Sequence, residues 1–143
     1  MNLTVKGKGS VKRSEFLIAI PFIMKKMNAH RLLPKIHLTV HYDTFTPFEG
    51  YCLPLDEDWE YKIGINPVQS SDRTMVISTL AHELVHLKQF ARKELTYAGT
   101  KFRFGGKVWD KQFPDCLLTP WEIEAYGMER GLAYAYLEFT HRK

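Results

Sequence analysis

Hydrophobic residues make up 45% of the 143 residues and charged residues 25%, which is the composition of a folded globular protein. A chain of this length forms one domain, here residues 1–143, and excludes a two-domain architecture. The net charge of +4 comes from lysines and arginines spread along the chain, so it favours an ordinary basic surface.

Cysteine usage and hydropathy point to a cytoplasmic protein. The two cysteines, Cys52 and Cys116, are too few for a disulfide framework and lie in no Cys-x-x-Cys pair. The longest apolar run, residues 16–24, is far shorter than the ~20 residues that cross a bilayer, and no signal-type cleavage site follows it. We therefore expect no membrane partner.

The predicted elements begin with a flexible arm over residues 1–13, which are rich in lysine and glycine. Ser14 is a suitable N-cap for a helix over 14–28, where apolar residues recur at helical spacing. Pro21 lies inside this pattern and would kink the helix or mark a late start.

Three strands are predicted next. Apolar and polar residues alternate over residues 35–43 and 59–66, and a short strand over residues 51–55 follows the turn at 44–49. The turns between them favour a small, mainly antiparallel sheet on which the N-terminal helix packs. His37 and His41 share the polar face of the first strand. They could form a metal site, but two solvent-facing histidines are the better interpretation.

Two helices flank an aromatic segment in the second half of the chain. A long helix is predicted over residues 73–93, and Thr119 is a suitable N-cap for another over 120–139. Residues 95–113 are rich in aromatics and glycine, which predicts a hairpin or an irregular loop that packs on the body rather than acting as a lid. The predicted fold class is α+β.

The 73–93 helix carries the motif His82-Glu83-x-x-His86. Residues four apart lie on the same face of a helix, so both imidazoles can reach one metal ion while Glu83 stands beside them as a general base. The apolar residues of this helix form a stripe on nearly the opposite side: Ile77, Leu80, Leu84, Leu87 and Ala91. The histidines should therefore face a cleft while the stripe packs on the sheet.

A catalytic zinc site needs a third protein ligand, and the chain offers few candidates. Only His141 follows His86, so the third ligand is sought among the carboxylates Glu122 and Glu124 of the last helix. These two point to opposite sides of the helix. Glu124 falls on the polar face, whereas Glu122 falls on a partly apolar face where a bound cation would offset its burial. The alternative is that Glu122 is only a first-turn carboxylate favoured by the helix dipole.

Three segments together resemble the gluzincin metallopeptidases, particularly the minigluzincins: Ile65-Asn66, His82 to His86, and Trp121 to Tyr126. They are also similar to compact SprT-like zincin proteins encoded by phages. The resemblance covers about residues 14–139. It implies a zincin-like fold with one Zn²⁺ bound by His82, His86 and Glu122, and with Glu83 as the general base.

The resemblance also implies that the strand over residues 59–66 lies at the edge of the sheet and binds extended substrate, through Tyr61, Lys62, Ile63, Gly64 and Ile65. Tyr126 stands where the family has an aspartate or asparagine that orients a zinc histidine, so another group, such as Glu129, must take this role. Candidates for steadying the oxyanion are Tyr97, Tyr126 and Arg130. The third histidine of SprT proteins is absent from the sequence.

The leading hypothesis is a zinc-dependent metallopeptidase acting on peptide or protein substrates in the cytoplasm, which is the host cytoplasm if a phage encodes it. One alternative is a zincin-fold regulatory or binding protein with structural zinc. Another is a nucleic-acid-associated protease, on account of the basic group Lys101, Arg103, Lys107 and Lys111. A monomer is favoured, and the oligomeric state stays open.

Overall fold

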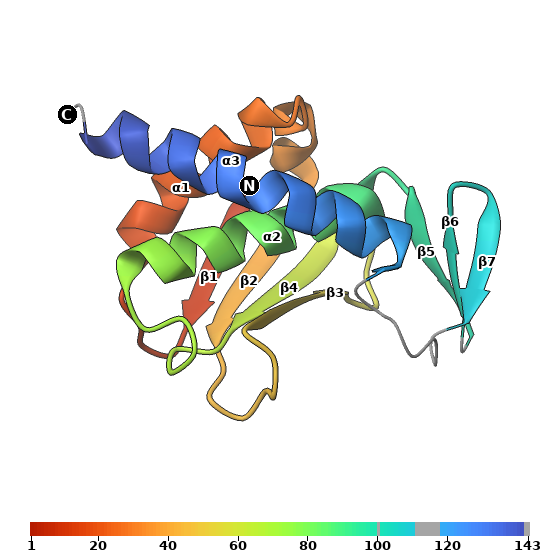
Figure 1. Cartoon of the computed structure of the whole chain (residues 1–143), viewed down its shortest axis with the longest axis horizontal. Coiled ribbons are helices and arrows are strands. Elements are labelled where there is room, and N and C mark those ends of the chain that lie inside the picture. Colours follow the sequence, from red (N-terminus) through yellow and green to blue (C-terminus); the bar gives the residue numbers. More distant parts are fainter. Residues whose placement is uncertain (100, 111–117, 142–143) are drawn as a thin grey trace.

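A four-stranded sheet with three α-helices on one of its faces forms the body of the structure (Figure 1). The computed structural model describes residues 1–99, 101–110 and 118–141. The strands are β1 (Asn2–Lys6), β2 (His37–Tyr42), β3 (Gly50–Pro54) and β4 (Glu60–Ile65). The helices are α1 (Arg13–Lys26), α2 (Arg73–Ala91) and α3 (Pro120–His141), and a 3₁₀ helix, η1 (His30–Lys35), precedes β2. The mixed α and β composition is as predicted.

The sheet is mainly parallel, so the antiparallel meander predicted from the sequence is wrong. The strand order is β1-β2-β4-β3, with β2 parallel to both β1 and β4, and only β3 antiparallel to its neighbour β4. Strands that follow each other in sequence are not always neighbours in a sheet. Here β3 lies at the edge, and β4 lies between β2 and β3. β4 is therefore paired on both sides. Its predicted place at the edge is also wrong, because the edge on that side is β3.

The N-terminal residues contribute a strand where the sequence analysis expected an arm. β1 pairs with β2 from Asn2 opposite His37 to Lys6 opposite His41, and the Asn2 amide donates to the Ile36 carbonyl at 2.9 Å. Leu3 is buried against the core. The alternation of Leu3 and Val5 was the signal for this strand, but it is short and the lysines and glycines around it masked it.

The core lies between the sheet and the helices. The stripe predicted on α2 is confirmed, since Ile77, Leu80, Leu84, Leu87 and Ala91 are all buried. They meet buried residues of α1 and the sheet, including Phe16, Ile20, Ile23, Val40 and Ile63. Burial of each large apolar side chain contributes about 1.5–3 kcal/mol, so this layer fixes α2 on the sheet.

The helix ends differ in how they are capped. α1 starts after Lys12, without a side-chain cap, instead of after Ser14, and it continues through Pro21. α2 starts after Asp72, whose side chain accepts a hydrogen bond from the Met75 amide at 2.8 Å. This cap fixes the register of α2, and with it the direction in which the motif histidines point.

A polar cluster joins all three helices at the C-terminal end of α3. The Arg73 guanidinium donates to both carboxylate oxygens of Glu15, at 2.6–3.0 Å, and to the Thr140 hydroxyl at 3.0 Å. The Tyr136 hydroxyl donates to Glu15 at 2.9 Å. Because Glu15 lies on α1, Arg73 on α2 and Tyr136 on α3, these contacts fix where α3 crosses the other two helices.

A second, antiparallel sheet projects from one side of the body (Figure 1). It consists of β5 (Leu95–Ala98), β6 (Lys101–Phe104) and β7 (Lys107–Asp110), in the segment for which a hairpin or loop was predicted. Its aromatic rings surround Trp121 in the first turn of α3, with centroid distances of 5.0 Å for Phe102 and 5.9 Å for both Phe104 and Trp109. The packing role favoured over a lid agrees with these contacts.

Among the described residues, no helix combines the length and apolar character that crossing a membrane requires. The cytoplasmic location and the monomeric state stay predictions. Cys116 and Lys111 lie outside the described residues. Cys52 is buried in β3 as a free thiol.

Replacing Gly50 with alanine should destabilise the protein by ~1–3 kcal/mol, because β3 approaches α2 too closely for a methyl group. A Cβ at this position would lie 2.6 Å from Thr79 Cγ2 and 2.9 Å from the Gly64 carbonyl oxygen. Chemical unfolding measures the change.

The control is Gly131→Ala on α3, where no heavy atom lies within 4 Å of the added Cβ. This substitution should stabilise the protein by ~0.5–1 kcal/mol, because alanine favours the helix. Equal effects of the two substitutions would contradict the close approach of β3 to α2.

Candidate metal centre

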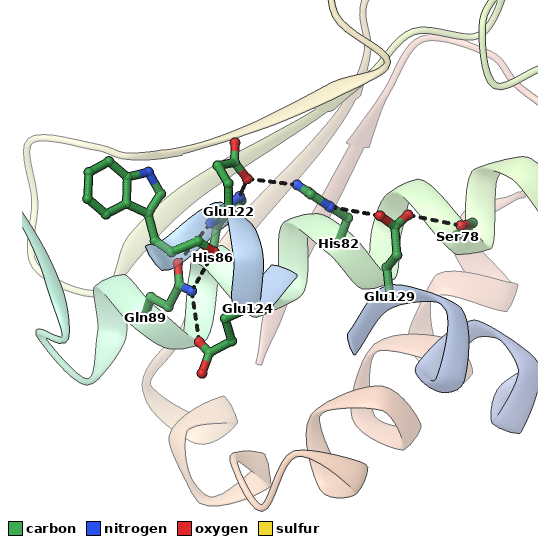
Figure 2. Close-up of polar contacts among 8 residues, drawn as sticks. Ser78, His82, His86, Gln89, Glu122, Glu124 and Glu129 are labelled. Atoms are coloured by element: carbon green, nitrogen blue, oxygen red, sulfur yellow. Dashed lines mark hydrogen bonds and ion pairs between the residues drawn. The ribbon is translucent and has the colours of Figure 1, made fainter. Parts of the chain in front are cut away.

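Three side chains from two helices converge on one point. His82 and His86 come from α2 and Glu122 comes from α3, and their nearest ligand atoms all lie within 4.8 Å of one another. Glu122 Oε1 lies 3.1 Å from His82 Nε2 and 2.6 Å from His86 Nε2 (Figure 2). The structure therefore brings together the three ligands predicted from the sequence.

Each ligand is placed by the local structure around it. One helical turn separates His82 and His86, so their rings lie on the same face of α2, with centroids 5.0 Å apart. Pro120 begins α3, and the amides of Glu122 and Ile123 donate to the Thr119 carbonyl. This short first turn directs Glu122 at the two imidazoles.

The donor set fits a transition metal. Two imidazole nitrogens and one carboxylate oxygen are ligands that zinc accepts, whereas calcium and magnesium prefer oxygen ligands only. His82 and His86 are buried, and Glu122 keeps 25% of its side chain exposed. Within the described part of the chain, no other three histidine, cysteine or acidic side chains converge in this way.

The electrostatics of the three ligands are strongly coupled. Burial opposes the charge on His82, but the hydrogen bond to Glu122 and the charges of Glu83, Glu122 and Glu129 raise its pKa to about 9. Burial likewise opposes the charge on Glu122, but its contacts with His82 and His86 lower its pKa to about 2. The cluster thus favours an ionised carboxylate facing positive charge.

Glu83 lies beneath the start of the edge strand β3. Its side chain is buried, and a Cβ added to Gly50 would lie 3.3 Å from Glu83 Oε2. Burial raises the pKa of Glu83 to about 7, although His86 and His82 act in the opposite direction. Burial, and secondly the charge of Glu83, raises the pKa of the nearby Cys52 thiol. The proposed base therefore stands between the motif helix and the edge of the sheet.

Glu129 contacts the outer ring nitrogen of His82, the role that Tyr126 cannot fill as an aspartate or asparagine would. Glu129 Oε1 lies 3.2 Å from His82 Nδ1, and its Oε2 accepts from Ser78 Oγ at 3.3 Å (Figure 2). Glu129 stands two helical turns beyond Glu122, whereas Tyr126 stands one turn beyond it. An acceptor on the outer nitrogen of a ligand histidine keeps the other nitrogen directed at the metal.

Of the three residues predicted to stabilise an oxyanion, only Tyr126 contacts one of the three clustered side chains, His82. Its half-exposed ring meets the His82 ring edge to face, with centroids 4.5 Å apart. Tyr97 packs instead between Phe90 and Phe102, at centroid distances of 5.5 Å and 4.9 Å. Arg130 is exposed on α3, and none of the contacts found among the described residues links it to the ligands.

Gln89 and Glu124 were missed by the sequence analysis as neighbours of the site. Glu124 was expected on the solvent face, but its Oε1 accepts from Gln89 Nε2 at 2.8 Å and from Lys88 Nζ at 3.2 Å. Gln89 Oε1 in turn accepts from His86 Nδ1 at 2.8 Å. The only signal in the sequence was the position of Gln89, three residues after His86 on the histidine face of the helix.

The five residues predicted to bind substrate, Tyr61, Lys62, Ile63, Gly64 and Ile65, lie on the interior strand β4. Tyr61, Ile63 and Ile65 are buried, and the Tyr51 ring covers Gly64 so closely that a Cβ there would meet it at 2.1 Å. Both hydrogen-bonding sides of β4 are used by β2 and β3. The described geometry therefore excludes β4 as an edge for an added strand.

Comparison with known proteins gave no match, whether to protein-family models, to curated proteins or to solved structures. The motif and the geometry of the site are therefore the observations that bear on function.

Zinc binding should release protons at neutral pH. Because the surrounding carboxylates keep the pKa of His82 at about 9, a metal must displace a proton from this imidazole. Glu122, with a pKa of about 2, is already ionised. The affinity should therefore rise with pH and level off near the pKa of His82. Calorimetry in buffers of different ionisation enthalpy, with chelator-buffered zinc, measures the protons released; a titration without proton release would be the contrary result.

Replacing Glu129 with alanine should weaken zinc binding ~10–100-fold, because His82 Nδ1 loses its acceptor. Glu129→Gln keeps an acceptor oxygen and should lose less. Competition with a chromogenic chelator gives both affinities, and Glu57→Ala, in the exposed turn before β4, is the control. Zinc binding by Glu129→Ala at the unaltered affinity would show that the contact with His82 is unimportant.

Proposed function

We propose that the protein is a zinc-dependent metallopeptidase of the gluzincin type. The observation that carries the proposal is the meeting of Glu122 Oε1 with His82 Nε2 and His86 Nε2, beside the buried carboxylate of Glu83. Burying charged groups is costly unless they are paired or bind a metal, so a bound metal ion would add to the pairing that already offsets the burial of these groups.

Among the described residues three side chains would hold the metal, so a tetrahedral ion bound by them would have a fourth position for water. A structural zinc site usually closes all four positions with protein ligands, whereas a catalytic site keeps one open for water. When bound, zinc would lower the pKa of that water and polarise the carbonyl of the bond to be cut. Three ligands among the described residues favour catalysis over the alternative of a structural metal in a binding or regulatory protein.

Glu83 is the general base in this proposal. Its carboxylate takes the proton of the attacking water and passes it to the leaving amine of the peptide. A pKa of about 7 suits a group that must both accept and return a proton near neutral pH. Burial beneath β3 keeps bulk water from competing for the carboxylate.

The edge strand β3 replaces β4 as the proposed substrate site. Among the described strands, β3 pairs only with β4, so we propose that an extended peptide adds to its other side. Gly50, at the start of β3, lies directly over Glu83. A peptide bond aligned there would pass beside the base. Tyr126, half-exposed next to His82, is the proposed donor to the substrate carbonyl.

The nucleic-acid-associated alternative has weaker support. Lys101, Arg103 and Lys107 are exposed on the second sheet, whereas Lys111 lies outside the described residues. Lys107 Nζ lies 4.5 Å from the centroid of the Trp109 ring. One of the three positive charges is therefore already in a contact within the protein. Phosphate contacts would make binding fall steeply with salt, so DNA binding that is absent at low salt would rule this alternative out.

Replacing Glu83 with glutamine should abolish peptide cleavage while zinc binding is retained. Glutamine keeps the size of the side chain but cannot accept the proton. Glu122→Ala should instead lose most of the zinc affinity together with the activity. Digestion of a peptide library, read by mass spectrometry, and metal analysis of the same samples separate the two effects. Cleavage by Glu83→Gln at the wild-type rate would refute the mechanism.

A further inference from the structure

Gln89 is a fully buried amide between α2 and α3, and all of its polar atoms have partners. Its Oε1 lies 2.8 Å from His86 Nδ1, and its Nε2 donates to the Trp121 carbonyl at 3.1 Å and to Glu124 Oε1 at 2.8 Å. Figure 2 shows Gln89 between His86 of α2 and Glu124 of α3. One side chain thus contacts a ligand histidine and the helix that bears the third ligand.

The chemistry of the partners fixes the orientation of the amide. The Trp121 carbonyl and the Glu124 carboxylate can only accept hydrogen bonds, so the NH₂ group of Gln89 must face them. The Gln89 carbonyl oxygen is then left facing His86, which must donate from Nδ1. A histidine that donates from Nδ1 presents Nε2 as its metal ligand, and Nε2 is the atom that meets Glu122.

Trp121 directly precedes Glu122, so its carbonyl belongs to the backbone that positions the third ligand. Its ring is packed by Phe102, Phe104 and Trp109 of the second sheet. The backbone at this point is therefore fixed from both sides: the ring by the aromatic cluster and the carbonyl by Gln89.

From this geometry we propose that Gln89 is a positioning residue for the metal centre, which sets the donor nitrogen of His86 and the placement of Glu122 at the same time. The proposal rests on the metal centre but not on peptide hydrolysis. A glutamate would not serve here, since its carboxylate would face Glu124 and the Trp121 carbonyl without a proton to donate. The amide is the group that accepts on one side and donates on the other.

The experiment measures zinc affinity and the His86 Nδ1 proton in the zinc-loaded protein. Gln89→Met keeps the volume of the side chain but removes all three hydrogen bonds. We expect zinc affinity to fall ~10–100-fold, and the His86 Nδ1 proton, seen by ¹⁵N NMR, to exchange with water faster than in wild type. Gln69→Met is the control, because the Gln69 side chain is exposed and its amide donates to the Pro47 carbonyl.

A second variant, Gln89→Glu, separates the contact with His86 from the contact with the Trp121 carbonyl. It also provides a test if the methionine variant does not fold. It keeps the acceptor for His86, so the slowly exchanging Nδ1 proton should persist, whereas zinc affinity should still fall because the contact with the Trp121 carbonyl is lost. Wild-type zinc affinity in either variant, or rapid exchange of the Nδ1 proton in the wild type, would overturn the proposal. A wild-type protein that binds zinc but cleaves no peptide contradicts the proposed function and leaves these expectations unchanged.

Discussion

The contact that the rest of the structure depends on is the one between a single carboxylate oxygen and two imidazoles. Glu122 Oε1 lies within hydrogen-bonding distance of both His82 and His86. This contact requires the first turn of α3 to lie against the middle of α2, and the buried face of α2 then dictates where the sheet must be. Because an unpaired buried charge is costly, each of the three groups makes the burial of the other two tolerable.

The motif and its third ligand could be predicted from the sequence because both depend on local geometry. A helix places His82 and His86 on one face whatever surrounds it, and the periodicity of α3 separates Glu122 from Glu124. The order of the strands was not predictable in this way. Alternation shows which face of β4 is buried, but it does not show which strands lie beside it, so the edge position implied by the family resemblance could not be checked against the sequence.

Gln89 and Glu124 show a second limit of reading one helix at a time. A helical wheel ranks faces by hydrophobicity, so a glutamate on the polar face is assigned to solvent. The wheel does not show where another helix will pack against that face. In the structure, Gln89 and Lys88 of α2 donate to Glu124, so the glutamate assigned to solvent is part of the polar network beside the candidate metal centre.

The polar cluster of Glu15, Arg73 and Tyr136 gives the distant end of α3 an influence on the site. Tyr136 lies about 21 Å along the helix axis from Glu122, at 1.5 Å per residue. If α3 pivots as a rigid rod about this cluster, a tilt of about 3° moves Glu122 by ~1 Å, a displacement large enough to impair a catalytic site. The placement of Glu122 therefore depends also on the contacts near the opposite end of α3, where α1, α2 and α3 meet.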